Sequence, residues 1–168
     1  MLNALRRRAE ERQAAQALLA ETTARARLSA FYDAYGVADT IDGRFDLLVL
    51  HVWLVLERLA SQKLQGLSQR LVDAVFVQFD EALRQQGAGD IGMSRRMTKF
   101  ADAFYGRLKA YGDAPDQDVL AAAIQRNVFR GNASKVEQAH ALAVYAAGTR
   151  QHLSGIDLSR GADFGPPP

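Results

Sequence analysis

The sequence predicts an all-α fold, a single-domain irregular bundle of about six helices around a central apolar helix at residues 44–63. Three observations support this prediction. Residues 44–59 are apolar on nearly every face of a helix. The flanking segments repeat apolar residues at spacings of three, four and seven, which place them on one helical face. No five-residue window alternates as an exposed strand would.

The central helix is the most informative element. It reads RFDLLVLHVWLVLERL from 44 to 59, and only Asp46, His51, Glu57 and Arg58 interrupt the run. A helix that is apolar all round belongs at the centre of a bundle or in a membrane. A membrane span needs about 20 consecutive apolar residues, whereas this run is shorter and carries a carboxylate and an imidazole. We therefore expect the core helix of a soluble bundle.

Two helices and a turn are expected before the central helix. Residues 2–19 are rich in Ala, Leu, Arg, Glu and Gln, which are strong helix formers. The segment 22–35 has aromatic and apolar residues at helical spacing and is followed by Gly36, a typical helix stop. The polar residues of 39–43 form a turn whose side-chain oxygens can cap the central helix.

Helices separated by Gly, Asp and Pro are expected after the central one. An apolar stripe begins at Ser68 and ends at Gln86, and the GAGDIG sequence at 87–92 breaks the chain there. The next helix is expected at 93–111, where GDAP then ends it. The last two are expected at 119–129 and from an Asn132 cap to about 153.

We expect the chain to divide into three parts: an N-terminal basic helical arm at 1–20, a helical domain at 21–153 and a flexible C-terminal tail at 154–168. The tail ends in GPPP and has no helical pattern, so it is expected to fray. The arm is rich in arginine, but its apolar face is mostly alanine. Contact between this arm and a membrane surface is therefore an alternative to a fully solvated arm.

Composition excludes several classes of site and leaves the partner open. With 21 basic and 19 acidic side chains, the net charge of +2 is too small to identify a nucleic-acid binder. The absence of cysteine excludes disulfides, thiolate zinc sites and thiol catalysis. Residues 1–20 lack the apolar core of a signal peptide. We expect a cytoplasmic protein, with a peripheral position at the inner membrane as an alternative; the oligomeric state stays open.

No catalytic pattern is recognisable. The histidines at 51, 140 and 152 form neither HxxxH nor HExxH. The GAGDIG loop lacks the preceding strand and the GKS/T ending of a nucleotide loop. We therefore expect a protein that is not an enzyme and has no cofactor.

His51 is the sharpest single residue. Inside an apolar helix its imidazole needs hydrogen-bond partners, because an unpaired buried polar group costs about 1–3 kcal/mol. We favour a neutral core histidine that is satisfied by a backbone carbonyl or by a neighbouring carboxylate. An axial haem ligand, or part of a quinone or peptide groove, is the alternative.

The helix expected at 93–111 carries a concentration of positive charge. Between residues 95 and 109, five bases stand against the single acid Asp102: Arg95, Arg96, Lys99, Arg107 and Lys109. This face is either solvated or in contact with phosphate, RNA or anionic lipid headgroups.

Three ordered stretches carry a family resemblance. They are residues 35–59, 71–111 and 120–129, and their most specific pieces are DGRF followed by LH, the G-x-GD-x-G loop and AFYGR. Together they resemble the ubiquinol–cytochrome c chaperone family, the bacterial relatives of the mitochondrial assembly factor for respiratory complex III. Two local departures are Ala38, where a proline is expected, and Ser94-Arg95 in place of a Gly-Lys pair.

The resemblance implies an assembly factor without catalytic residues. Its expected partner is newly made cytochrome b or another complex III subunit, and the ribosome or an anionic membrane surface is a further one. Several positions match recurring motifs of the family and are expected to have structural or binding roles: Asp42, Gly43, Arg44, Phe45, His51, Gly89 and Asp90.

An apolar groove rimmed with bases would suit such a partner. Aromatic residues and arginine dominate interface hot spots. We therefore expect rim contacts from Arg95, Arg96, Lys99 and Arg107, and aromatic anchors in Trp53, Phe104 and Tyr105, although Trp53 also suits the core. A ribosome- or RNA-associated helical binding module is the alternative, and it rests on the basic helix.

Overall fold

A computed structural model describes residues 2–85 and 90–168 of the chain. Within these ranges the regular structure is helical and contains no strand, so the prediction of an all-α fold is confirmed. The described helices are α1 (Leu2–Ala26), α2 (Ala30–Asp33), α3 (Ile41–Ser61), α4 (Gln65–Gln85), α5 (Asp90–Gly112), α6 (Gln117–Asn127) and α7 (Val136–Leu153). Short 3₁₀ turns cover Ala133–Lys135 and Leu158–Arg160.

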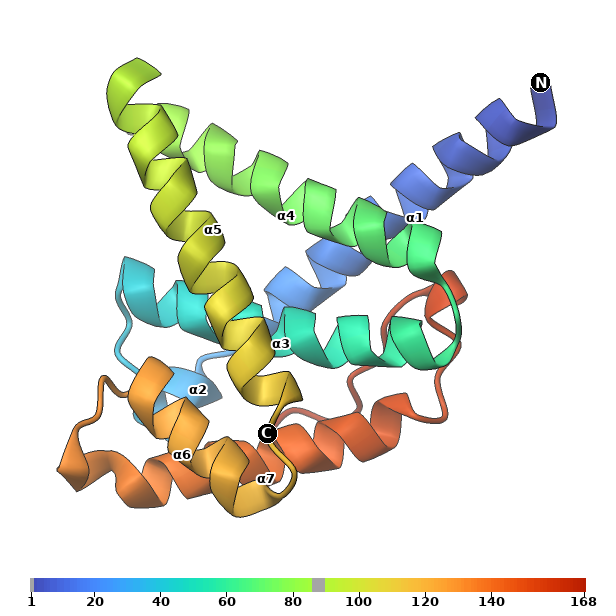
Figure 1. Cartoon of the computed structure of the whole chain (residues 1–168). Helices are drawn as coiled ribbons and strands as arrows, with labels where there is room; N and C mark the ends of the chain where they lie inside the picture. The colour runs from blue at the N-terminus through green and yellow to red at the C-terminus, as the bar shows by residue number, and fades with distance from the viewer. Residues whose placement is uncertain (1, 86–89) are drawn as a thin grey trace.

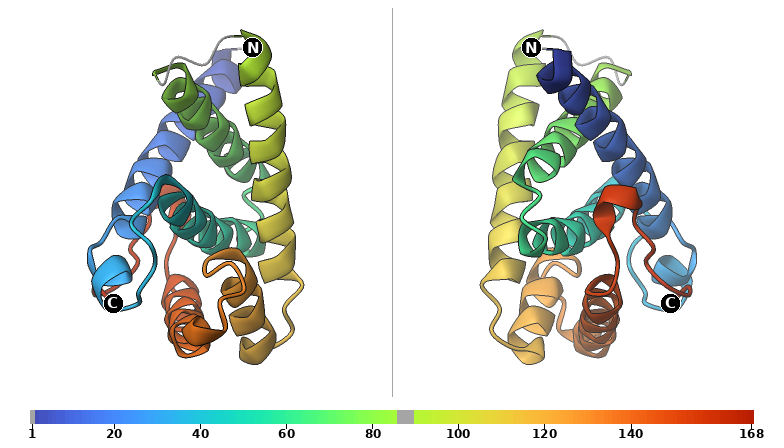
Figure 2. Two further views of the ribbon diagram at one scale, coloured as in Figure 1. Left: turned by 90° about the vertical axis from the view of Figure 1, so that its left-hand side faces the viewer. Right: turned by 90° about the vertical axis from the view of Figure 1, so that its right-hand side faces the viewer.

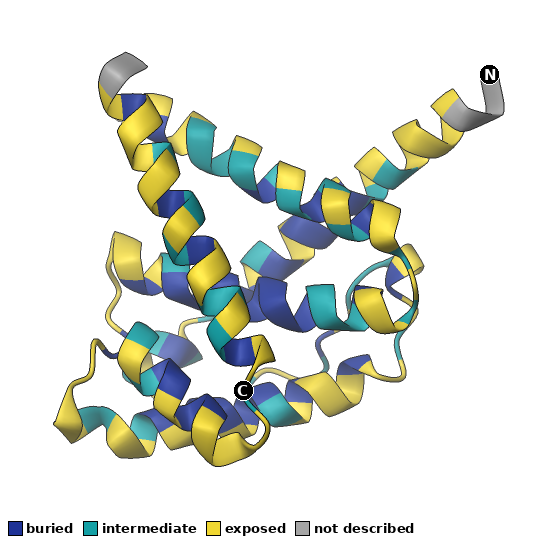
Figure 3. Ribbon diagram, viewed as in Figure 1, coloured by how far each residue is buried: buried dark blue, intermediate teal, exposed yellow. Residues whose placement is uncertain are grey.

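The helix α3 lies in the middle of the bundle (Figure 1). The helices α1, α4 and α5 lie on one side of it, and α6 and α7 pack together on the other (Figure 2). Most of its length is buried (Figure 3), including Leu47, Leu50 and Val55, none of which is exposed. The prediction of a central apolar helix is confirmed. No helix in the described part of the chain has the length and apolar character needed to cross a membrane.

Local interactions at Thr40 and Gly43 set the start of α3. Thr40 has extended backbone angles, and its hydroxyl accepts a hydrogen bond from the amide of Gly43 at 3.1 Å. A Cβ atom on Gly43 would lie 1.9 Å from the carbonyl oxygen of Ala38, so only glycine fits here. The helix consequently spans 41–61 in place of the predicted 44–63.

The N-terminal segment differs from its prediction. The expected helices at 2–19 and 22–35 are replaced by one continuous helix, α1, and a single turn, α2. Residues 18, 19 and 22 of α1 are buried, so tertiary packing carries the helix past residue 20. The predicted boundary of the basic arm therefore falls inside α1, whose residues 5–10 are exposed on every side. Figure 1 shows this first part projecting away from the bundle.

The helix α5 begins earlier than predicted. It starts at Asp90 and includes Gly92, whereas the sequence predicts a start at 93 after a glycine-rich break. The first residues of that break, Gly89 among them, lie outside the described residues. The helices α4 and α5 diverge from this end of the bundle, as the two arms of a V (Figure 1).

The segment 154–168, which the sequence predicts to be a flexible tail, lies against the bundle. Leu158 and Phe164 are buried, so the tail packs on the bundle through two apolar side chains. Hydrogen bonds from a side chain of α1 to the main chain of this segment hold it in place as well. Arg25 donates to the carbonyl oxygens of Gly165 and Pro166 at 3.1 and 2.7 Å. These long-range partners have no local signature, which is why the sequence alone suggested fraying.

Candidate docking groove

An apolar groove opens where the end of α1 meets α3, α4 and α5. It has a volume of about 230 Å³ and reaches from the start of α3 to the last turns of α4. Its floor is made of apolar side chains from three helices: Leu48 and Val49 of α3, Val75 and Phe79 of α4, and Phe100 of α5. We call this site the apolar groove.

Aromatic packing gives the groove a rigid wall. The ring of Phe79 stacks on that of Phe100 with their centroids 3.7 Å apart. The ring of Phe45 lies 5.4 Å from Phe100 in a tilted arrangement. Phe45 and Phe79 are only partly buried, so their edges face the opening. Side chains held by such contacts lose little further freedom when a ligand covers them.

Two arginines flank the opening of the groove. Arg27 at the end of α1 is exposed. Arg44 on α3 pairs with Asp39 at 2.7 Å, and its guanidinium lowers the pKa of the Asp39 carboxyl. Ile41, 71% exposed, adds an apolar residue to the same edge. The groove thus combines an apolar floor with a basic rim, and Arg44 and Phe45 are the lining residues for which the sequence predicts structural or binding roles.

Arg107 is not a rim residue. Its Nε donates to the Oδ1 of Asp46 at 2.7 Å, and Arg107 retains only 14% of its side-chain exposure. Asp46 is fully buried, and its second oxygen lies 2.8 Å from Nη1 of Arg130. Burial raises the pKa of Asp46, and the two guanidinium groups oppose this rise. Arg107 therefore forms an ion pair that joins α5 to α3, and its predicted contact with a partner stays a prediction.

His51 is a neutral core histidine. Its Nδ1 lies 2.7 Å from the carbonyl oxygen of Leu47, so Nδ1 carries the proton. Its Nε2 then accepts from the hydroxyl of Tyr145 at 2.8 Å, and that oxygen accepts from Nε of Arg25 at 2.9 Å. The predicted carbonyl partner is confirmed, and the second partner is a hydroxyl in place of a carboxylate. Neither ring nitrogen is left for a haem or quinone.

Acid is expected to destabilise the protein through His51. Burial lowers the pKa of His51 from 6.5 to about 4, so between these values the unfolded chain binds the proton that the folded chain excludes. The free energy of unfolding should fall by about 3 kcal/mol from this group as the pH drops from 6.5 to 4. Urea unfolding of the parent protein and of the His51→Gln variant between pH 6.5 and pH 4 tests this expectation. The stability difference between the two should shrink with falling pH; a constant difference would contradict the assignment.

The predicted aromatic anchors separate into two classes. Trp53 is 6% exposed and Phe104 is not exposed, so both side chains lie in the core of this structure. Trp53 lies 5.7 Å from the Tyr111 ring, and Phe104 lies 5.5 Å from that of Phe76. Tyr105 is 53% exposed on α5 and remains a predicted anchor. Aromatic residues occur on more than one face of α5. The sequence alone therefore could not show which of these faces the other helices would cover.

The remaining predicted bases lie apart from the apolar groove. Arg95, Arg96 and Lys99 are exposed on the N-terminal half of α5, and no ion pair joins them to an acidic side chain that the structure describes. Asp90 is the first residue of the same helix, and Gly89 is outside the described residues. Their predicted roles are untested by this geometry.

The DGRF motif lies at the edge of the groove. Asp42 is exposed in the first turn of α3, 3.8 Å from Arg130. Gly43 permits the tight turn, while Arg44 and Phe45 line the opening. Sequence reasoning missed Arg27 and Leu48 as groove residues. Their helices carry ordinary apolar stripes and charges, and only the tertiary fold brings them together.

Comparisons with known proteins agree with this architecture. Residues 33–160 match the family described as ubiquinol-cytochrome C chaperone. The chain is 23% identical over 131 residues to ubiquinol-cytochrome-c reductase complex assembly factor 1 of Xenopus laevis, covering 76% of this chain and 66% of that relative. A crystal structure of the Cbp3 homolog from Brucella abortus is similar with a TM-score of 0.78 and 36% identity, covering 93% of this chain and 89% of that one.

The matched region contains each element that builds the groove except α1. It includes the DGRF motif, the central helix and the ion pair of Asp46 with Arg107. The resemblance inferred from short motifs therefore extends over most of the fold. The chain belongs to the ubiquinol-cytochrome c chaperone family.

Proposed function

We propose that this protein is an assembly factor for ubiquinol–cytochrome c reductase, respiratory complex III, and that its apolar groove holds a segment of newly made cytochrome b. The observation that supports this most directly is an apolar, aromatic-walled groove with arginines at its rim. An unassembled membrane subunit exposes apolar helices that must be kept from aggregating. Membership of the family and the name of the frog relative support a role in assembling the same complex.

The groove suits a small part of such a subunit. Covering one large apolar side chain is worth about 1.5–3 kcal/mol. Two or three side chains seated on Leu48, Phe79 and Phe100 would therefore give a reversible complex, since part of the gain is offset by lost mobility. Reversibility matters because a chaperone must release its client to the next assembly step. Arg27 and Arg44 would contact acidic loop residues next to the bound segment.

Charged substitutions in the groove should abolish client binding without unfolding the protein. Ile41 and Ala82 line the groove and are both exposed, so Ile41→Glu combined with Ala82→Glu adds charge to the site but not to the core. We expect at least about a tenfold loss of cytochrome b that co-purifies from the native membranes. Complex III should decline in a strain that carries only this variant.

The matched control is Val144→Glu on α7. Val144 is an exposed apolar residue, at 55%, and does not line the groove. It should retain normal binding, and both variants should keep the helical circular dichroism of the parent. Normal complex III in a deletion strain would refute the assembly role. Normal binding of cytochrome b by the Ile41→Glu, Ala82→Glu variant would refute the apolar groove as the binding site.

A ribosome- or RNA-associated role is the second candidate, because Arg95, Arg96 and Lys99 stay exposed and form no ion pair with an acid in the described ranges. It requires ribosome binding that weakens steeply with salt and with Arg95→Glu combined with Arg96→Glu. Loss of complex III in this variant, with the groove variant unaffected, would favour the second candidate over the first.

A further inference from the structure

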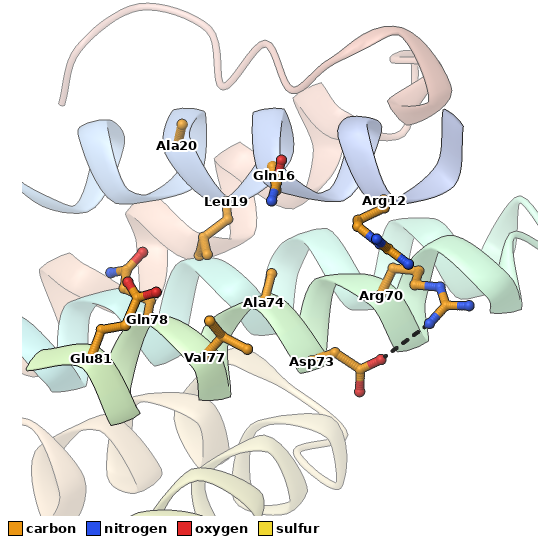
Figure 4. A pocket seen from close by; sticks show the side chains of 10 residues that line it. All are labelled: Arg12, Gln16, Leu19, Ala20, Arg70, Asp73, Ala74, Val77, Gln78 and Glu81. Atoms are coloured by element: carbon orange, nitrogen blue, oxygen red, sulfur yellow. Dashed lines mark ion pairs between the residues drawn. The ribbon is translucent and has the colours of Figure 1, made fainter. Parts of the chain in front are cut away.

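A second groove runs along the seam between α1 and α4 (Figure 4). The two helices pack side by side, and the space between their exposed faces has a volume of about 410 Å³. We call it the α1–α4 seam. Of the residues that line it, only Gln78 also lines the apolar groove, so the two sites are separate surfaces.

The middle of the α1–α4 seam is apolar. Leu19 of α1 points toward α4, where Ala74 and Val77 lie opposite (Figure 4). Val77 is 57% exposed, whereas Leu19 is only 7% exposed, so Val77 supplies most of the apolar area that the seam leaves in water. This surface leaves apolar area in water that a partner could cover.

The two ends of the seam carry opposite charges. Arg12 and Arg70 lie together at one end, and Glu81 lies at the other (Figure 4). Arg70 pairs with Asp73 at 3.7 Å. Arg12 and Glu81 form no ion pair with any side chain in the described ranges. An open cation and an open carboxylate therefore flank the apolar middle.

The dimensions fit a helix. Arg70 and Glu81 are eleven positions apart on α4, which corresponds to about 16 Å or three turns. A third helix laid against two neighbouring helices fills the groove between them, as in helical bundles. Extended segments gain less here, because their side chains alternate between two faces and only one would meet the seam.

We infer that the α1–α4 seam docks one amphipathic helix of a partner protein. The helix presents an apolar stripe of about three turns to Val77 and Ala74, with acidic residues at the end that meets Arg12 and basic residues at the end that meets Glu81. This inference does not depend on the proposed function, because it concerns a different surface and does not require cytochrome b.

The test uses three synthetic helical peptides of about 14 residues, each with the same Leu and Ala stripe. One is acidic at one end and basic at the other, one is acidic throughout and one is basic throughout. Titration with the full-length protein should show the tightest binding for the charge-polarised peptide. Val77→Asp should weaken that binding at least about tenfold. Val144→Asp, an equally exposed apolar residue on α7, should leave it unchanged.

Exchanging the charges of Arg12 and Glu81 tests whether the two ends of the seam determine the orientation of the bound helix. Arg12→Glu alone and Glu81→Arg alone should each weaken the charge-polarised peptide about three- to fivefold, as expected for exposed pairs. The double variant should recover the affinity, because a helix can turn end for end. Equal binding of all three peptides, or no recovery in the double variant, would overturn the inference. So would a dimer of the free protein that Val77→Asp dissociates, since a second copy would then be the occupant.

Discussion

Replacing Asp46 with alanine is expected to lower the free energy of unfolding by about 3–5 kcal/mol, the loss typical of removing one partner from a buried ion pair. Asp46 is fully buried and neutralises Arg107, which is itself only 14% exposed. Without the carboxylate, the guanidinium of Arg107 stays buried and unpaired. Arg130 adds less to this loss, because it is 49% exposed and can return to water. Chemical denaturation with far-UV circular dichroism measures the effect.

The exposed pair of Asp39 and Arg44 provides a matched control. It has the same 2.7 Å separation, but its side chains are 55% and 59% exposed. Asp39→Ala should therefore leave the midpoint of denaturation nearly unchanged, because solvent screens an exposed pair. A similar loss in the two alanine variants would show that burial of the Asp46 pair contributes nothing special.

An apolar replacement of the whole pair separates charge from packing. Asp46→Leu combined with Arg107→Met removes both charges and keeps side chains of similar size. This double variant should recover most of the stability that Asp46→Ala loses, since buried pairs often exchange for apolar residues at little cost. Failure to recover would mean that the hydrogen bond from Arg107 to the carbonyl oxygen of Ala103 is essential as well.

Arg107 shows where sequence reasoning reached its limit. The charge on α5 was evident, but the sequence does not reveal that Arg107 faces Asp46, the buried carboxylate of the central helix. The helix α5 also contains Arg95 and Arg96, which remain exposed. Local sequence thus distinguishes charged residues from apolar ones, and only the tertiary fold decides which charges are buried.

The central helix was predictable for the opposite reason. An all-round apolar run has one stable place in a bundle, so α3 needed no knowledge of its neighbours. The assignment of His51 followed similarly, because any buried imidazole must find partners, and a backbone carbonyl four residues back is always in reach. The second partner, Tyr145, lies 94 residues away and could not be inferred.

The position of the segment 154–168 depends on residues that are distant in the sequence. It contains few apolar residues, yet Arg58 and Gln62 donate to the carbonyl oxygen of Ile156 at 3.0 and 3.1 Å. Such side-chain contacts to the main chain do not depend on the identity of the tail residue they bind. A sequence pattern therefore cannot reveal them, and the Gly- and Pro-rich composition predicts only a fraying segment.

Gly43→Ala is expected to destabilise the protein by about 2–3 kcal/mol, although alanine is the better helix former. The added Cβ would lie 1.9 Å from the carbonyl oxygen of Ala38, a backbone atom that cannot rotate away. Either the first turn of α3 unwinds or the turn before it shifts. Both responses displace Ile41 and Arg44, so binding at the apolar groove should weaken together with stability.

Gly106→Ala on α5 is the matched control for this prediction, because its expected change in stability has the opposite sign. Gly106 also lies within a helix, but a Cβ there meets no atom within 4 Å. The variant should be unchanged or more stable by up to about 1 kcal/mol. Thermal and urea unfolding of the two variants therefore compare one chemical change in two settings. Opposite signs would identify the contact with Ala38, and not helix propensity, as the reason that glycine occupies position 43; a common sign would refute this explanation.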